Sequence, residues 1–217
     1  MSNNSTNSQI TEEKLKKLKN IKTASFAVWL SDEKRKEYVN KNIEENLGNL
    51  KNNVILLGLN PSEPKYNPSR ELKPFYNFHD GSDADIFLRE SISKCEALKG
   101  AYMTDISQTE KGTENEVEIS DNDIEIFKEQ LKILGKKEYF VVCFGKKTFE
   151  NLLKDQTPKK ENNIETKSGK FGDYDLHCYK VLHYSKVINY GTNPAKFISE
   201  LEAANELISK YLAAHSQ

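Results

Sequence analysis

Residues 54–59 are continuously apolar, and the run ends abruptly at Asn60 and Pro61. A strand with one face in water alternates apolar and polar residues, whereas a strand of a parallel sheet that is covered on both faces does not. The Asn-Pro pair is a turn signal, since proline fixes its own φ angle and restricts the residue before it. The run therefore predicts an interior strand of a parallel sheet, which requires helices on both of its faces.

Helical patterns and further apolar segments alternate along the rest of the chain. The clearest helical spacing lies between Ser120, which suits an N-cap, and Gly135, which suits the end of a helix. The polar residues 155–175 predict a surface loop or hairpin. Three more strands are predicted at 100–106, 139–145 and 177–183. The alternation predicts an α/β protein with three α/β/α layers around a central, mostly parallel, four-stranded sheet.

One domain is predicted to include residues 11–217. Thr11 is placed to cap a first helix, and Ser31 opens a second, highly charged one. We expect both helices, within residues 11–50, to pack on the sheet. The polar residues 1–10 predict a disordered tail.

The composition excludes several classes of protein. The chain has 217 residues, with 32 Lys and Arg against 33 Asp and Glu, which excludes a wholly basic protein that coats nucleic acid. No stretch approaches the roughly 20 apolar residues of a membrane helix, and the polar start lacks the features of a signal peptide. Three widely spaced cysteines form no metal or redox motif. We expect a cytoplasmic protein with reduced thiols, no metal and no organic cofactor.

Polar side chains follow the predicted strands at the edge where ligands bind in open parallel sheets. Asn60 follows the first strand, Asp105 the second and His183 the fourth. An amide, a carboxyl group and an imidazole are therefore predicted to meet at one edge. Each residue alone also has an ordinary structural explanation: a turn, a helix cap or a buried histidine.

Four blocks, in order over roughly residues 50–200, resemble the uracil-DNA glycosylase superfamily. Gly-Leu-Asn-Pro-Ser at 58–62 is similar to the first motif, in the Gly-x-Asn-Pro-Gly form of the mismatch-specific and single-strand-selective branches. The block at 183–191 resembles the second motif, His-Pro-Ser followed by a DNA-inserting loop. Pro74-Phe75 stands where the family keeps an aromatic ring, and residues 102–105 stand where several branches place a base-reading Asn. Three positions depart from the family pattern: Ser62 replaces Gly, Tyr184 replaces Pro and Asp105 replaces Asn.

The resemblance implies a role for each matching residue. Asn60 would position the attacking water, and His183 would stabilise the negative charge on the departing base. Phe75, with Phe78 as the alternative ring, would stack on the extruded base, and Val187 with Ile188 would fill the space that the base leaves. The remaining residues implied by the motifs line the base pocket, as Gly58, Leu59 and Asp105 do, or contact DNA, as Ser62, Ser185 and Lys186 do.

Asp105 is the departure with the clearest chemical consequence. The amide of an Asn can accept a hydrogen bond from uracil N3–H and donate one to O4, whereas an ionised Asp can only accept. A buried, protonated Asp could donate one bond instead. The acceptor pattern fits an exocyclic amino group, as on cytosine or adenine, better than uracil. Alternatively, Asp105 is a catalytic carboxylate, caps the next turn, or leaves base recognition to another residue.

The resemblance predicts a monomeric hydrolase that removes uracil or another altered base from double- or single-stranded DNA. Residues 136–197 carry 12 lysines against 7 acidic residues, which fits a phosphate-binding surface and equally a solvated one. Residues 105–129 are acidic, with 9 acidic residues against 2 lysines. Two alternatives stay open: a catalytically silent module that binds a base or DNA on the same fold, and a pocket for a free nucleoside.

Overall fold

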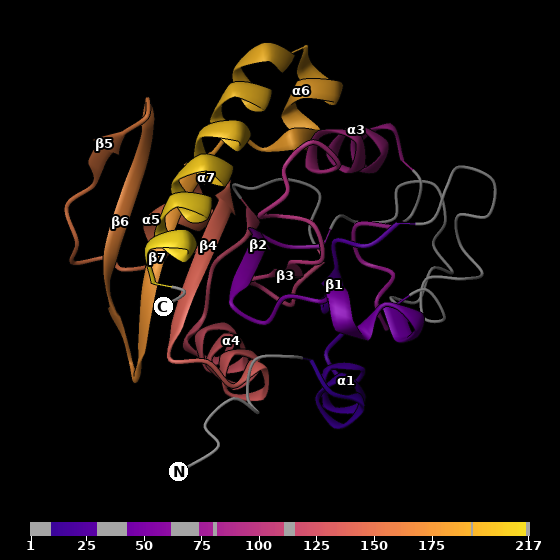
Figure 1. Cartoon of the computed structure of the whole chain (residues 1–217). Coiled ribbons are helices and arrows are strands. Elements are labelled where there is room, and N and C mark those ends of the chain that lie inside the picture. Colours follow the sequence, from indigo (N-terminus) through magenta and orange to yellow (C-terminus); the bar gives the residue numbers. More distant parts are fainter. Residues whose placement is uncertain are drawn as a thin grey trace.

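The structure, a computed structural model, describes residues 10–29, 43–61, 74–79, 82–110, 116–191 and 193–215 (Figure 1). Its centre is one sheet with the strand order β1-β3-β2-β4-β7-β6-β5. The strands are β1 (Ser25–Phe26), β2 (Val54–Gly58), β3 (Tyr102–Asp105), β4 (Glu138–Phe144), β5 (Lys159–Glu161), β6 (Ile164–Phe171) and β7 (Tyr174–Val181). The helices are α1 (Glu12–Leu18), η1 (Leu47–Asn49), α3 (Asp83–Ile92), α4 (Asp121–Leu134), α5 (Lys146–Asn151), α6 (Tyr184–Tyr190) and α7 (Pro194–Ala214).

The predicted parallel centre of the sheet is confirmed, whereas the predicted number of strands is wrong. The four predicted strands are β2, β3, β4 and β7, and they pair in parallel. β1 pairs antiparallel with β3, while β6 and β5 continue antiparallel from β7, which makes seven strands. The polar residues 155–175, for which a surface loop or hairpin was predicted, contain the antiparallel pair β5 and β6, and β5 is exposed along its length. An edge strand of this kind faces water and needs few apolar residues, so hydropathy did not indicate that this segment extends the sheet.

Alternate residues of β2 supply two separate cores, one on each face of the sheet. Ile55 and Leu57 belong to the cluster that α1, α4 and α5 cover, and Val54 and Leu56 belong to the cluster that α3, α6 and α7 cover. In Figure 1, α7 crosses in front of β4 and β7. The unbroken apolar run of β2 is therefore explained by burial on both faces, and the three-layer α/β/α arrangement is confirmed.

The helix boundaries of α4 follow the predicted signals. Ser120 caps the helix: its Oγ accepts from Asp123 N at 3.1 Å, and the Asp123 carboxylate accepts from Ser120 N at 2.9 Å. Gly135 ends the helix with a φ of 77°, a left-handed conformation that is costly for residues with a Cβ atom. Reciprocal capping and a terminal glycine thus fix the length of this helix.

The described N-terminal part of the chain packs against α4 and the core on that face of the sheet. Leu15 and Leu18 of α1 are buried, and Lys14 Nζ donates to Leu134 O at 3.0 Å. Ile10 is also buried, so the predicted tail does not include it. The rest of that tail and most of the predicted second helix, at 1–9 and 30–42, lie outside the described residues.

Candidate functional site

The ends of the four parallel strands lie at one level of the sheet. Leu57 is in register with Cys143, and Cys143 is in register with Lys180, so β2, β4 and β7 end at the same level of the sheet. Asn60 and His183 each follow two residues after the end of their strand. Only β4 separates β2 from β7, and adjacent strands lie about 4.8 Å apart, so these two strand ends are about 10 Å apart. The register therefore brings Asn60 and His183 to the same edge.

Gly58 and Asp105 face each other across the β2–β3 pair. They are partners in the register, and Ile106 N donates to Gly58 O at 3.1 Å. A Cβ atom at position 58 would lie 2.0 Å from Asp105 Oδ1 and 3.5 Å from Phe78 Cζ. Only a residue without a side chain lets the Asp105 carboxyl group lie this close over the end of β2.

Asp105 is a buried carboxyl group with one strong hydrogen bond. The residue is 2 % exposed, and Asn77 Nδ2 donates to its Oδ2 at 2.7 Å. Burial raises the pKa of Asp105 to about 7, although the Asn77 hydrogen bond acts in the opposite direction. Near neutral pH the folded protein therefore contains both the protonated and the ionised carboxyl group.

The segment at 74–79 holds Asn77 in place. Asn77 Nδ2 also donates to Thr23 O at 3.1 Å, and Ser25 Oγ donates to Phe75 O at 3.0 Å. Phe75 and Phe78 both have a φ of 66°, a conformation that costs bulky residues energy and persists where the surroundings enforce it. The hydrogen bonds to residues 23 and 25 supply that enforcement, since they tie the segment to the start of β1.

The two predicted stacking rings lie on opposite faces of the sheet. Phe75 is fully buried in the cluster under α1 and α4, where its ring lies 6.0 Å from that of Phe26. Phe78 belongs to the other cluster, with its ring next to Gly58 and 6.4 Å from the ring of Tyr184. Phe78, and not Phe75, is therefore the ring that the fold brings to Asp105 and α6.

His183 is held at the start of α6 by its own cap. Its Nδ1 accepts from Ser185 N at 3.2 Å and lies 2.8 Å from Ser185 Oγ. Because the backbone N–H can only donate, Nδ1 is an acceptor, and the neutral ring carries its proton on Nε2. The ring also stacks on Tyr184, with centroids 4.8 Å apart and planes at 20°. The N–H donor of this half-buried ring is therefore Nε2–H.

The block at 184–190 is a helix and not the predicted loop, and this separates its two apolar residues. Val187 is 4 % exposed and packs in the core. Ile188 is 40 % exposed, the one exposed large hydrophobic side chain among the described residues. Ser185 and Lys186 lie half-buried in the first turn. Of the predicted pair, only Ile188 is placed to reach a ligand outside the protein.

The first motif lies at the end of β2, where the structure describes it only in part. Leu59 is buried in the core under α1 and α4, so its side chain does not point to the Asp105 face. Asn60 is half-buried, and its Nδ2 donates to Pro61 O at 2.9 Å. Ser62 lies outside the described residues.

Two residues of the site were missed from the sequence. Asn77 lies in an irregular segment, and no local pattern links it to a carboxyl group 28 positions further along the chain. Tyr184 was read only as a replacement for Pro, yet its ring packs on Phe144 at 5.4 Å and on His183. The contacts of Asn77 with Asp105 and of Tyr184 with Phe144 join segments far apart in the chain, which no local sequence signal reveals.

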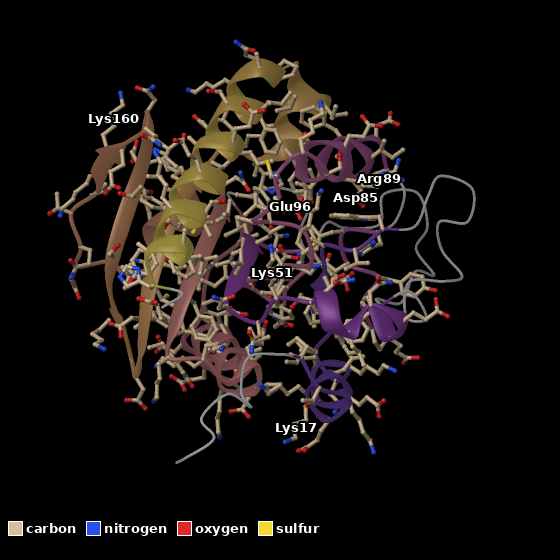
Figure 2. All side chains as sticks on the ribbon, viewed as in Figure 1. Lys17, Lys51, Asp85, Arg89, Glu96 and Lys160 are labelled. Atoms are coloured by element: carbon tan, nitrogen blue, oxygen red, sulfur yellow. The ribbon has the colours of Figure 1, made fainter. Side chains whose placement is uncertain are left out.

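The lysine-rich C-terminal part is partly neutralised by ion pairs. Lys170 pairs with Asp175 at 2.7 Å, and Lys180 pairs with Glu165. Lys160 lies on the exposed edge strand β5, at the periphery of the molecule (Figure 2). Pairs of this kind reduce the positive field available to a phosphate backbone.

Neither metal ligation nor a membrane-spanning helix is found in the part of the chain that the structure describes. In these ranges no three His, Cys, Asp or Glu side chains are grouped so that they could hold a metal ion. Over the same ranges, no helix combines the length and the apolar character that crossing a bilayer demands.

Comparison with known proteins does not extend this description. No protein-family model matches the chain, and a search of curated proteins finds no significant match.

Proposed function

We propose that the protein is a DNA N-glycosylase with a uracil-DNA glycosylase-like fold, which hydrolyses the bond between an altered base and deoxyribose. On this proposal it acts in the cytoplasm as a monomer, on double- or single-stranded DNA, and its own side chains perform the chemistry. The single observation that carries the proposal is the common level of three strand ends, which bear Asn60, Asp105 and His183.

The chemistry requires two charges to be stabilised. As the bond from C1′ to the base nitrogen breaks, the sugar gains oxocarbenium character and the base leaves with the bonding electron pair. Water then adds to C1′ and releases a proton. The products are the free base, once protonated, and a sugar with a hydroxyl group at C1′.

The proposed roles follow from the functional groups at the strand ends. The Asn60 amide would orient the water, and the His183 Nε2–H would donate to the base carbonyl oxygen, where negative charge develops. Phe78 would stack on the base, and Ile188 would enter the vacated stack. A neutral amide offers the cationic sugar less stabilisation than a carboxylate, so we expect slow turnover.

The test is base release from labelled oligonucleotides that contain uracil, hypoxanthine, xanthine or unmodified cytosine, in single- and double-stranded form. Alkaline cleavage at the abasic product gives the rate. Asn60→Ala and His183→Ala should each lower the rate by about 10²- to 10³-fold, whereas the exposed controls Asn49→Ala and His215→Ala should leave it unchanged. Equal rates in all four variants would refute the assigned roles.

A second candidate is a catalytically silent module that binds DNA or a base on the same fold. The hydrogen bond from Asn60 Nδ2 to Pro61 O favours it, because this is also what an amide in a purely structural turn does. Such a module would bind duplexes with an abasic site or a mismatch without releasing any base. Detectable release that Asn60→Ala abolishes would exclude it.

A further inference from the structure

We infer that Asp105 reads the base through one carboxyl oxygen, Oδ1, which changes from hydrogen-bond donor to acceptor when the carboxyl group loses its proton. Asn77 is the positioning residue, because it binds the other oxygen, Oδ2, and so leaves Oδ1 for the base. This inference rests on the proposed function and specifies how that site selects its substrate. It predicts a preference for carbonyl-bearing bases in the protonated state and for amino-bearing bases in the ionised state.

The two oxygens of Asp105 have different surroundings. Oδ2 accepts from Asn77 Nδ2 at 2.7 Å, and the same Nδ2 donates to Thr23 O at 3.1 Å. A flipped Asn77 amide would turn its oxygen toward two acceptors, so the orientation is fixed. Oδ1 has no hydrogen-bond partner among the described residues and lies over Gly58. One oxygen is therefore occupied, and the other is directed at the end of β2.

The position of the proton follows from this asymmetry. When Asp105 is protonated, the proton belongs on Oδ1, because a proton on Oδ2 would oppose the N–H group of Asn77. Oδ1–H then donates to a carbonyl oxygen, such as O4 of uracil. When Asp105 is ionised, Oδ1 accepts from an amino group, such as N4 of cytosine, and repels a carbonyl oxygen. A side-chain amide, in contrast, offers a donor and an acceptor at every pH.

The titratable side chains on the neighbouring elements have hydrogen-bond partners other than Asp105, so they do not account for its proposed titration. β1 and β2 contribute no ionisable side chain. On β3, Tyr102 OH donates to Gln130, and on the segment after β3 the backbone N of Gln108 donates to Asp123. His79 Nε2 lies 3.1 Å from Phe26 O. The ring of Tyr184 lies 6.4 Å from the ring of Phe78, and His183 Nδ1 faces Ser185.

The experiment measures the ratio of uracil release to cytosine release from otherwise identical single-stranded oligonucleotides, between about pH 5.5 and about pH 8.5. Taking the ratio removes the pH dependence of groups that act on both bases alike. In the wild-type protein the ratio should fall by about tenfold or more across this range, since a single ionisation changes the preferred partner.

Two variants and one spectroscopic measurement make the result decisive. Asp105→Asn should give a ratio that does not depend on pH. Asn77→Ala removes the donor that favours the ionised form, so the pH at which the ratio changes should move upward. Should Asn77→Ala unfold, the ¹³C carboxyl resonance of Asp105 in the wild-type protein gives the same information, with an expected midpoint near neutral pH.

The outcomes separate this inference from the proposed function. Release of both bases at a ratio that is constant across pH would overturn the inference and leave the glycosylase activity in place. Absence of release of any base at any pH would overturn both. A wild-type carboxyl midpoint near the ordinary value for Asp would also overturn the inference, whatever the activity.

Discussion

Replacing Gly58 with alanine tests the close approach on which the site depends. The new Cβ would lie 2.0 Å from Asp105 Oδ1, whereas real Cβ contacts are essentially never shorter than 3.0 Å. The carboxyl group cannot turn away freely, because Asn77 holds Oδ2 at 2.7 Å. The backbones cannot separate freely either, because Ile106 N donates to Gly58 O at 3.1 Å.

The expected change in the free energy of unfolding can be estimated from the contacts that Gly58→Ala would disrupt. Forcing an extra carbon into a packed site costs about 1–3 kcal/mol, and loss of the Asn77 hydrogen bond adds about 1 kcal/mol. Against this, alanine is favoured over glycine in a strand by roughly 0.5–1 kcal/mol, because it loses less backbone entropy on folding. We expect Gly58→Ala to lower the free energy of unfolding by about 1–3 kcal/mol after this offset.

The assay is urea unfolding of Gly58→Ala in two backgrounds, wild type and Asp105→Ala. Without the carboxyl group the nearest remaining atom is Phe78 Cζ at 3.5 Å, an ordinary contact, so the cost should fall below about 1 kcal/mol. Gly48→Ala is the matched control, since nothing lies within 4 Å of a Cβ at that position. An equal cost of Gly58→Ala in both backgrounds would refute the proposed conflict with Asp105.

Three further predictions concern the same edge of the sheet. Burial raises the pKa of Asp105 to about 7, so between about pH 4 and pH 7 the unfolded chain has lost the proton that the folded protein keeps, and the stability that this group confers falls as pH rises. In urea unfolding, Asp105→Asn should therefore gain stability relative to wild type across that pH range, by about 1.4 kcal/mol per unit of pKa difference, with no gain at lower pH. Val187→Ala should lower the free energy of unfolding by about 1–3 kcal/mol, whereas Ile188→Ala should leave thermal unfolding unchanged and weaken base release from duplex DNA; the reverse pattern would contradict the assigned roles. Phe75→Leu should reduce stability alone, while Phe78→Leu should also slow base release, and equal effects on release would show that the distinction between the rings is wrong.

Local sequence was sufficient wherever one segment contained the whole cause of its structure. The apolar run at 54–59 predicted β2, because burial on both faces removes the alternation of polar residues. Ser120 and Gly135 marked the ends of α4, because their capping interactions involve only near neighbours in the chain. The Asn, Asp and His at three strand ends followed from the rule that parallel strands end at a common edge.

The tertiary structure decided everything that depends on where the chain crosses the sheet. Phe75 and Phe78 are three residues apart and share the same φ, yet they pack in the two clusters on opposite faces of the sheet. Helix formation at 184–190 separated Val187 from Ile188, and the polar edge strand β5 joined the sheet through its pairing with β6. The partnership of Asn77 with Asp105 joins residues that no periodicity connects. Periodicity in a sequence records average burial. The contacts that determine the protonation of a carboxyl group or the orientation of an aromatic ring form only when distant segments are brought together.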